Sequence, residues 1–139
     1  MHILIVEDEE LDVIALQRAF KKHQVHYKTT ITRNGAEALA VLRGDDPERE
    51  FITDPVFILL DINMPRMNGL EFLKELRADS FLKRIPVFVL TTSDEQRDIQ
   101  AAYRLGISGY TLKQKVGGDF EKLVALLNAY ADLVVFPDG

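Results

Sequence analysis

Residues 56–69 read Val56-Phe57-Ile58-Leu59-Leu60-Asp61-Ile62-Asn63-Met64-Pro65-Arg66-Met67-Asn68-Gly69, and this stretch decides the fold. Its first five residues are all apolar, which is typical of a strand buried on both faces in a parallel sheet covered by helices. Met64-Pro65 favours a loop, and the apolar spacing in residues 70–76 predicts a helix after it. Asp61 therefore stands at the carboxyl end of a buried strand, where open α/β sheets place their functional groups.

Asp61 has a simpler alternative role as the N-cap of the helix that follows. An N-cap residue comes directly before the first helical turn, whereas Asp61 precedes residues 70–76 by several positions. We therefore favour a functional site at Asp61 over a purely structural cap.

The composition limits the classes of protein to consider. A chain of 139 residues fits one domain. Acidic residues outnumber basic ones by 22 to 17, giving a net charge of −5, so we expect no DNA binding. The absence of cysteine excludes disulfides and thiolate metal sites. We see no signal peptide and no apolar stretch of membrane-spanning length, and we expect a cytoplasmic protein without membrane contact.

Strand and helix patterns alternate five times along the chain, with an exposed loop at residues 44–50. Such alternation predicts a parallel sheet with helices on both faces, joined by right-handed crossovers. The predicted strands cover residues 2–6, 27–32, 56–60, 85–90 and 107–112. The first predicted helix ends near residue 24, the second begins at residue 34, and the third ends near residues 78–79. The fourth runs from Asp94 to Gly106, and the fifth includes residues 120–130.

Polar side chains follow four of these strands: Glu7 with Asp8, then Asp61, Thr91 and Lys113. Taken singly, a threonine after a strand is usually a turn residue and a lone lysine is usually a surface charge. Because all carboxyl ends of a parallel sheet lie at one edge, these residues are expected to converge.

Converging carboxylates need a counter-charge, because two of them about 4 Å apart repel by roughly 4 kcal/mol at an effective dielectric constant of 20. Hard oxygen ligands without thiolate or imidazole favour Mg²⁺, which also binds phosphate oxygens. Lys113 would add a second positive charge. An aspartate, Mg²⁺, a lysine and a hydroxyl donor together suit phosphoryl transfer onto the carboxylate.

Four motifs resemble the response-regulator receiver domains of two-component signalling, over about residues 1–131. They are Val-Glu-Asp-Glu-Glu at 6–10, Leu-Leu-Asp-Ile-Asn-Met-Pro-Arg-Met-Asn-Gly at 59–69, Val-Leu-Thr-Thr-Ser at 89–93 and Gly-Tyr-Thr-Leu-Lys at 109–113. The resemblance implies an α/β flavodoxin-like three-layer sandwich, whose parallel five-stranded sheet has the order 2-1-3-4-5. It implies a signalling protein rather than an enzyme.

The resemblance also implies roles for the metal and the phosphoacceptor. Asp61 would accept a phosphoryl group from a phosphohistidine on a sensor histidine kinase. Asp8 would be a direct Mg²⁺ ligand with Asp61, Glu7 would help through water, and Asn63 would offer its backbone carbonyl to the metal.

Three further residues match the positions that respond to the phosphoryl group. Lys113 would contact phosphoryl oxygens, Thr91 would donate its hydroxyl to them, and Tyr110 resembles the aromatic switch that moves with Thr91. A simpler role for Tyr110 is packing of an edge strand against the fourth helix. Both roles are compatible.

One residue departs from the family pattern, which has a proline joined by a cis bond directly after the lysine. This chain has Gln114, for which a cis bond would cost about 2.5–4 kcal/mol. We therefore expect a trans bond and a differently shaped loop, which would affect the placement of Lys113.

The output is expected to pass through a partner or through self-association, because no effector domain follows residue 131 in this chain. Residues 44–55 and 84–93 resemble stand-alone regulators of phytochrome-type photoreceptor kinases. Residues 132–139 form an apolar tail that either packs back on the last helix or grips a second subunit. We expect a symmetric homodimer through the fourth helix, the fifth strand, the last helix and this tail.

The sequence is also compatible with two rival functions. An Asp-nucleophile phosphohydrolase would need a second aspartate as general acid two residues after Asp61, where this chain has Asn63. It would also need an inserted lid to enclose its substrate, and this chain has none. A pseudo-receiver would be a binding module with an inactive site, and Gln114 is the only feature that favours it.

Overall fold

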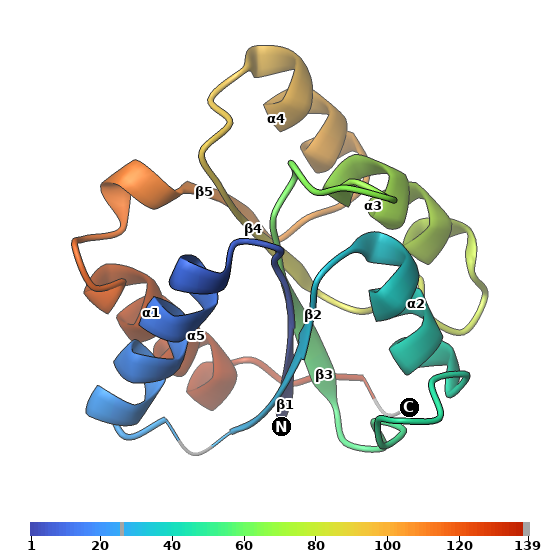
Figure 1. Ribbon diagram of the computed structural model, residues 1–139, viewed down its shortest axis with the longest axis horizontal. Coiled ribbons are helices and arrows are strands. Elements are labelled where there is room, and N and C mark those ends of the chain that lie inside the picture. Colours follow the sequence, from blue (N-terminus) through green and yellow to red (C-terminus); the bar gives the residue numbers. More distant parts are fainter. Residues whose placement is uncertain (26, 138–139) are drawn as a thin grey trace.

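The structure is a computed structural model that describes residues 1–25 and 27–137. Within these residues, five strands alternate with five helices, as the sequence predicts (Figure 1). The strands are β1 (His2–Val6), β2 (Lys28–Thr32), β3 (Val56–Leu60), β4 (Val87–Thr91) and β5 (Gly109–Leu112). The helices are α1 (Glu10–Lys22), α2 (Gly35–Arg43), α3 (Gly69–Ala78), α4 (Gln96–Arg104) and α5 (Glu121–Leu133), with a 3₁₀ turn η1 (Lys113–Lys115) before α5.

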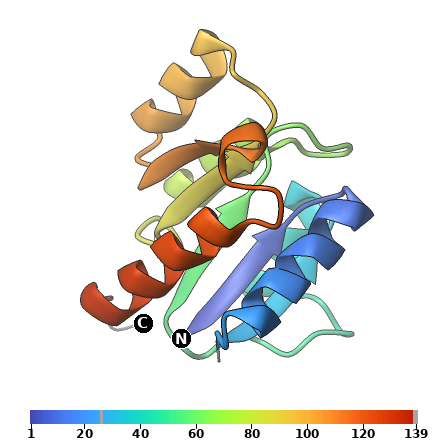
Figure 2. The same ribbon diagram turned by 90° about the vertical axis from the view of Figure 1, so that its left-hand side faces the viewer.

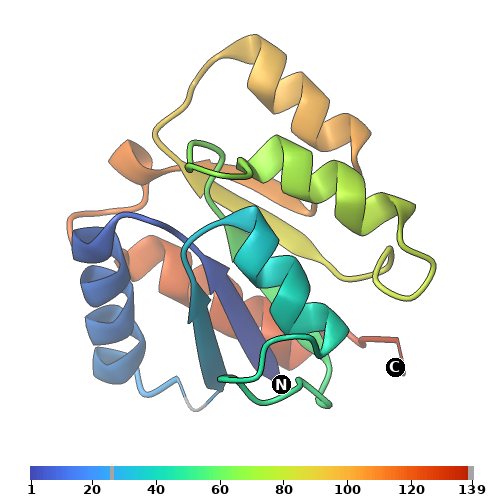
Figure 3. The ribbon, with the colours of Figure 1, turned by 45° about the vertical axis from the view of Figure 1, so that its right-hand side comes forward.

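All five strands are parallel and lie in the order β2-β1-β3-β4-β5, which confirms the predicted fold class and strand order. Helices α1 and α5 cover one face of the sheet (Figure 2). Helices α2, α3 and α4 cover the other face (Figure 3). The resulting three layers are those of the flavodoxin-like fold.

The central strand β3 contributes to both halves of the core because its side chains alternate between the two faces. Phe57 and Leu59 pack with α1 and α5, whereas Ile58 and Leu60 pack with α2 and α3. All four are buried. Burial on both faces of the sheet therefore explains the unbroken run of apolar residues in β3, as the sequence predicts.

Several boundaries differ from the sequence predictions. Strand β4 begins at Val87, because Pro86 lacks the N–H that a ladder residue donates. The strand also includes Thr91. Helix α4 begins at Gln96 rather than Asp94, and β5 begins at Gly109 rather than at residue 107. Helix α1 ends at Lys22, two residues before Gln24, which has a positive φ of 54°.

Helix α3 starts unusually close to the end of β3. A Cβ atom on Gly69 would lie 2.3 Å from the backbone oxygen of Asp61 and 2.8 Å from the Cα of Ile62. The Gly69 N–H donates to the Ile62 carbonyl over 2.8 Å. Asn68 caps the helix by accepting from the Glu71 N–H, and the Glu71 side chain accepts from the Asn68 N–H. Gly69 therefore allows α3 to begin directly beside Asp61.

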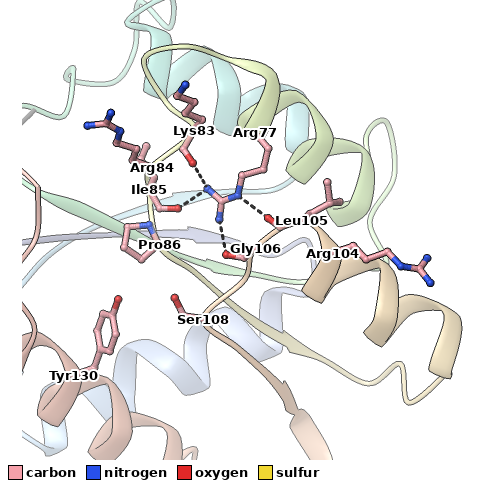
Figure 4. A pocket seen from close by; sticks show the side chains of 10 residues that line it. All are labelled: Arg77, Lys83, Arg84, Ile85, Pro86, Arg104, Leu105, Gly106, Ser108 and Tyr130. Carbon is pink, nitrogen blue, oxygen red and sulfur yellow. Dashed lines mark hydrogen bonds between the residues drawn. The ribbon is translucent and has the colours of Figure 1, made fainter.

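At the opposite edge of the sheet, Arg77 joins the loop before β4 to the loop between α4 and β5. Its guanidinium donates to the carbonyls of Leu105 (2.7 Å) and Gly106 (3.2 Å) after α4, as Figure 4 shows. It also donates to the carbonyls of Lys83 and Ile85 before β4, both over 2.8 Å. The sequence analysis did not predict this contact, which fixes the C-terminal end of α4 to α3.

The C-terminal tail packs partly on the rest of its own chain. The Phe136 ring stacks on Phe57 of β3, with centroids 6.3 Å apart and an interplanar angle of 17°, and it meets Tyr130 edge-on at 5.6 Å. By contrast, Leu133 and Val135 are 81% and 93% exposed. Phe136 of the tail thus packs within the chain, whereas Leu133 and Val135 face outward.

Candidate functional site

The register of the sheet brings the predicted site residues to one edge. Val6 pairs with Leu60, so Glu7 and Asp61 follow neighbouring positions in β1 and β3. The Asp61 N–H donates to the Val6 carbonyl over 3.0 Å. Thr91 pairs with Leu112, so Lys113 leaves β5 beside the end of β4. The convergence predicted from the sequence is therefore present in the backbone.

Lys113 links the strands through its side chain. Its Nζ lies 2.5 Å from Glu7 Oε1, 2.6 Å from Asp12 Oδ2 and 3.5 Å from Asp61 Oδ2. Glu7 and Asp61 are buried, and the Lys113 side chain is only 11% exposed. Because charges at buried positions are screened poorly, one ammonium can bridge three carboxyl groups.

Burial and mutual repulsion perturb the charges of this cluster. Burial of the Glu7 carboxyl, reinforced by the negative charge of Asp61, raises its pKa to about 8 against the opposing effect of Lys113. The carboxylates of Asp12 and Glu7 raise the pKa of Lys113 even though burial lowers it. Negative charge is therefore disfavoured at Glu7 next to Asp61, and a bound cation would relieve that repulsion.

Three carboxylates have the geometry to share that cation. Glu7, Asp8 and Asp61 each offer an oxygen, and the three oxygens lie within 4.8 Å of one another. Asp8 is exposed, so the cluster opens to solvent on that side. An all-oxygen donor set fits a hard divalent cation such as Mg²⁺ or Mn²⁺. Asn63, the fourth predicted ligand, lies exposed in the loop two residues after Asp61.

The Asp61 carboxylate has two differently occupied oxygens. Its Oδ1 accepts from the Ile62 N–H over 2.8 Å, and its Oδ2 faces Lys113. These contacts hold the side chain at the strand end without a helix-capping bond. The N-cap of the next helix is Asn68, so the purely structural cap considered for Asp61 is wrong.

The two predicted switch residues are connected through Ser93. Thr91 is fully buried, and its hydroxyl accepts from the Ser93 N–H over 3.3 Å. The Tyr110 hydroxyl donates to the Ser93 carbonyl over 2.8 Å, and the Tyr110 N–H donates to the Tyr103 hydroxyl of α4 over 3.2 Å. Tyr110 thus packs against the fourth helix, as its simpler role predicts, and is also bonded to the loop that follows Thr91.

The loop after Lys113 differs from the family pattern as expected. The bond between Lys113 and Gln114 is trans, and residues 113–115 form the 3₁₀ turn η1. Lys113 nevertheless lies within contact distance of Asp61. The departure at Gln114 therefore leaves the lysine at the site.

Asp12 is the site residue that the sequence analysis missed. It lies in the first turn of α1, as does Glu10, and acidic residues are common there because they suit the helix dipole. Glu10 is exposed, whereas Asp12 contacts Lys113. Position in the first turn was the only available signal, and it does not distinguish the two residues.

This arrangement can bind a cation beside a nucleophilic carboxylate and place an ammonium near the same oxygen. Those features suit the transfer of an anionic group onto Asp61. Among residues 1–25 and 27–137, no helix is both long and apolar enough to cross a bilayer.

Comparisons with known proteins agree with this geometry. Residues 3–128 match the response regulator receiver domain family. Response regulator Rcp1 of Synechocystis is 37% identical over 128 residues, covering 92% of this chain and 86% of Rcp1. The phosphorylated cyanobacterial phytochrome response regulator RcpA superposes with a TM-score of 0.85 at 32% identity, covering 98% of this chain and 97% of RcpA.

A structure of Rcp1 with bound Mn²⁺ also superposes, with a TM-score of 0.82 and 34% identity over 98% of each chain. The family match spans most of the chain and includes every strand end of the site. The resemblance drawn from the four motifs is confirmed, and the chain belongs to the response regulator receiver domains of two-component signalling.

Proposed function

We propose that Asp61 is a phosphoacceptor that takes a phosphoryl group from a phosphohistidine of a sensor histidine kinase. The observation that carries this proposal is the contact of buried Asp61 with Lys113 beside the Glu7–Asp8–Asp61 oxygen cluster. An Asp61 oxygen attacks phosphorus, an O–P bond forms, and the P–N bond to the histidine breaks with the electron pair going to the imidazole.

The other residues of the site support this transfer. Asp8 and Asp61 would hold Mg²⁺ with the Asn63 carbonyl, and Glu7 would act through water. The metal would neutralise charge that develops on the transferred group. Lys113 would contact the phosphoryl oxygens and Thr91 would donate its hydroxyl to them. Tyr110 would follow Thr91 through their shared neighbour, Ser93.

A kinase of the phytochrome type is the partner that the comparisons favour. RcpA is a phytochrome response regulator, and Rcp1 is similar to this chain over nearly its whole length. Purified phytochrome-type kinase should therefore phosphorylate Asp61 faster than a chemotaxis-type kinase does. Equal rates with both kinases would contradict the assignment of the partner while leaving the phosphoacceptor in place.

We also propose a symmetric homodimer through α4, β5, α5 and the tail. The support is apolar exposure at Leu133 and Val135, with Leu126 of α5 also exposed. Sedimentation velocity should show a dimer for the wild type and a monomer for the double variant Leu133→Asp, Val135→Asp. A monomeric wild type, with and without phosphorylation, would rule out this assembly.

The phosphoacceptor is tested by titrating the protein with beryllofluoride and Mg²⁺, read by NMR. We expect saturable shifts near Asp8, Thr91 and Lys113 in the wild type and none in Asp61→Asn. Asp8→Asn should remove the shifts by weakening metal binding, whereas Asp94→Asn, an exposed carboxylate beyond β4, should bind like the wild type.

The rival functions give different results in the same protein. A pseudo-receiver would bind Mg²⁺ without responding to beryllofluoride. A phosphohydrolase would turn over many equivalents of a small phosphate ester, whereas a phosphoacceptor takes up one group per chain before slow hydrolysis. Mass spectrometry of the protein treated with acetyl phosphate distinguishes these outcomes.

A further inference from the structure

Asp12 is a carboxylate at the site for which the proposed phosphotransfer reaction has no use. Its Oδ2 lies 2.6 Å from Lys113 Nζ, whereas Asp61 Oδ2 lies 3.5 Å from the same nitrogen. The ammonium is therefore closer to the first turn of α1 than to the phosphoacceptor.

Lys113 does not depend on Asp12 for its location. Glu7 lies 2.5 Å from the same nitrogen, and its side chain is 3% exposed compared with 28% for Asp12. A Glu7 oxygen would thus still accept from the ammonium if the Asp12 charge were removed. What Asp12 changes is how the three N–H donors and the charge of Lys113 are shared among neighbouring anions.

The oxygen cluster makes this sharing important. Glu7, Asp8 and Asp61 belong to the group that could hold a metal, and Asp12 lies outside it. A cation bound there would balance the charge of Glu7, Asp8 and Asp61. The Asp12 carboxylate would still compete with an anion on Asp61 for the Lys113 ammonium. That competition opposes any new bond from Lys113 to an anion on Asp61.

We propose that Asp12 is a positioning residue that holds the Lys113 ammonium on the α1 side of the site and thereby weakens its bond to a phosphoryl group on Asp61. This inference rests on the phosphoacceptor role of Asp61 proposed above. Its consequence is a phosphorylated state that is less stable and shorter-lived than the site would otherwise support.

The test compares beryllofluoride affinity, in the presence of Mg²⁺, for the wild type, Asp12→Asn, Lys113→Met and the double variant. We expect Asp12→Asn to bind beryllofluoride about threefold more tightly or better, and to retain its phosphoryl group longer by a similar factor. In the Lys113→Met background the same substitution should change the affinity less than twofold, because its effect passes through Lys113.

Glu10→Gln is the matched control, because it removes an equal charge from the same turn of α1 at an exposed position. It should bind beryllofluoride like the wild type. The ¹³Cε shift of Lys113 should move in Asp12→Asn without ligand and stay unchanged in Glu10→Gln. Asp12→Ala should reproduce the tighter binding, and circular dichroism checks that each variant is folded.

The outcomes separate this inference from the proposed function. A wild type that binds no beryllofluoride overturns both. A wild type that binds, with Asp12→Asn unchanged or weaker, overturns the inference and leaves the phosphoacceptor intact. Tighter binding that persists in the Lys113→Met background also overturns it, because Asp12 would then repel the ligand directly.

Discussion

The Tyr110 hydroxyl on β5 donates a hydrogen bond to the backbone carbonyl of Ser93 over 2.8 Å. Ser93 lies in the loop that follows Thr91, and its own N–H donates to the Thr91 hydroxyl. A side chain of β5 and a buried hydroxyl at the phosphoacceptor edge thus share one loop residue. Any movement of this loop must alter both bonds.

Replacing Tyr110 with phenylalanine should loosen this loop. The substitution removes one partly buried hydrogen bond, so we expect a loss of about 1 kcal/mol in the free energy of unfolding. Amide hydrogen exchange of residues 93–96 should accelerate more than that of β4. Tyr27→Phe is the control, since its hydroxyl bonds to Asp132 at the surface. Unchanged exchange at Ser93 would contradict the connection.

Tyr110 should also ionise later than an ordinary tyrosine. Burial raises its pKa, with smaller contributions from nearby carboxylates. Because the folded-state pKa exceeds the unfolded value of about 10, stability from this group is complete below pH 10 and falls as the pH rises beyond it. Absorbance titration at 295 nm should lose a late-ionising component in Tyr110→Phe. Superimposable wild-type and variant curves, apart from amplitude, would show that Tyr110 ionises normally.

Gly69→Ala should be strongly destabilising. Its Cβ would meet the Asp61 backbone oxygen at 2.3 Å, so α3 must shift away from the site. We expect a loss of about 2–4 kcal/mol in urea unfolding and weaker beryllofluoride binding. Gly118→Ala is the matched control, because a Cβ there meets nothing within 4 Å. Equal stability of the two variants would mean that the close approach of α3 is not needed.

Arg77 should stabilise the fold far more than its neighbour Arg104. Both line the same cavity of about 510 Å³, but only Arg77 points into it and bonds to the two loops (Figure 4). Arg77→Met should lower the free energy of unfolding by about 2–3 kcal/mol because four carbonyls lose a charged donor. Arg104→Met should change it by less than about 0.5 kcal/mol. Similar losses in both variants would point to general charge effects instead.

The fold could be predicted because its signals are local. Five apolar residues before Asp61 indicate a strand buried on both faces, and burial of Ile58 and Phe57 on opposite sides is the physical basis of that pattern. Boundaries were harder to predict. Asp94 resembles a helix start, but in the structure Ser93 donates to Asp98 over 2.6 Å and the helix begins at Gln96.

The site was predictable only as far as strand ends determine it. Glu7, Asp61 and Lys113 follow strands and Thr91 is the last residue of β4. A parallel sheet gathers such residues at one edge. No comparable rule predicts which side chains of a helix contact the site. Leu11 shares the helical spacing of α1 yet is 74% exposed, because the rotation of a helix on the sheet depends on packing rather than on period. The same uncertainty hid the contact between Asp12 and Lys113.

The tail gives the last prediction, because its residues divide between the chain's own core and solvent. Phe136 stacks on Phe57 and meets Tyr130 edge-on, so Phe136→Ala should cost about 1–2 kcal/mol in the free energy of unfolding. Val135→Ala, at a 93% exposed position, should leave the free energy of unfolding of the monomer unchanged. Urea unfolding at several protein concentrations separates folding from assembly, since a dimer contact makes the midpoint depend on concentration. If the Phe136→Ala loss vanished on dilution, its ring would serve a second subunit rather than its own β3.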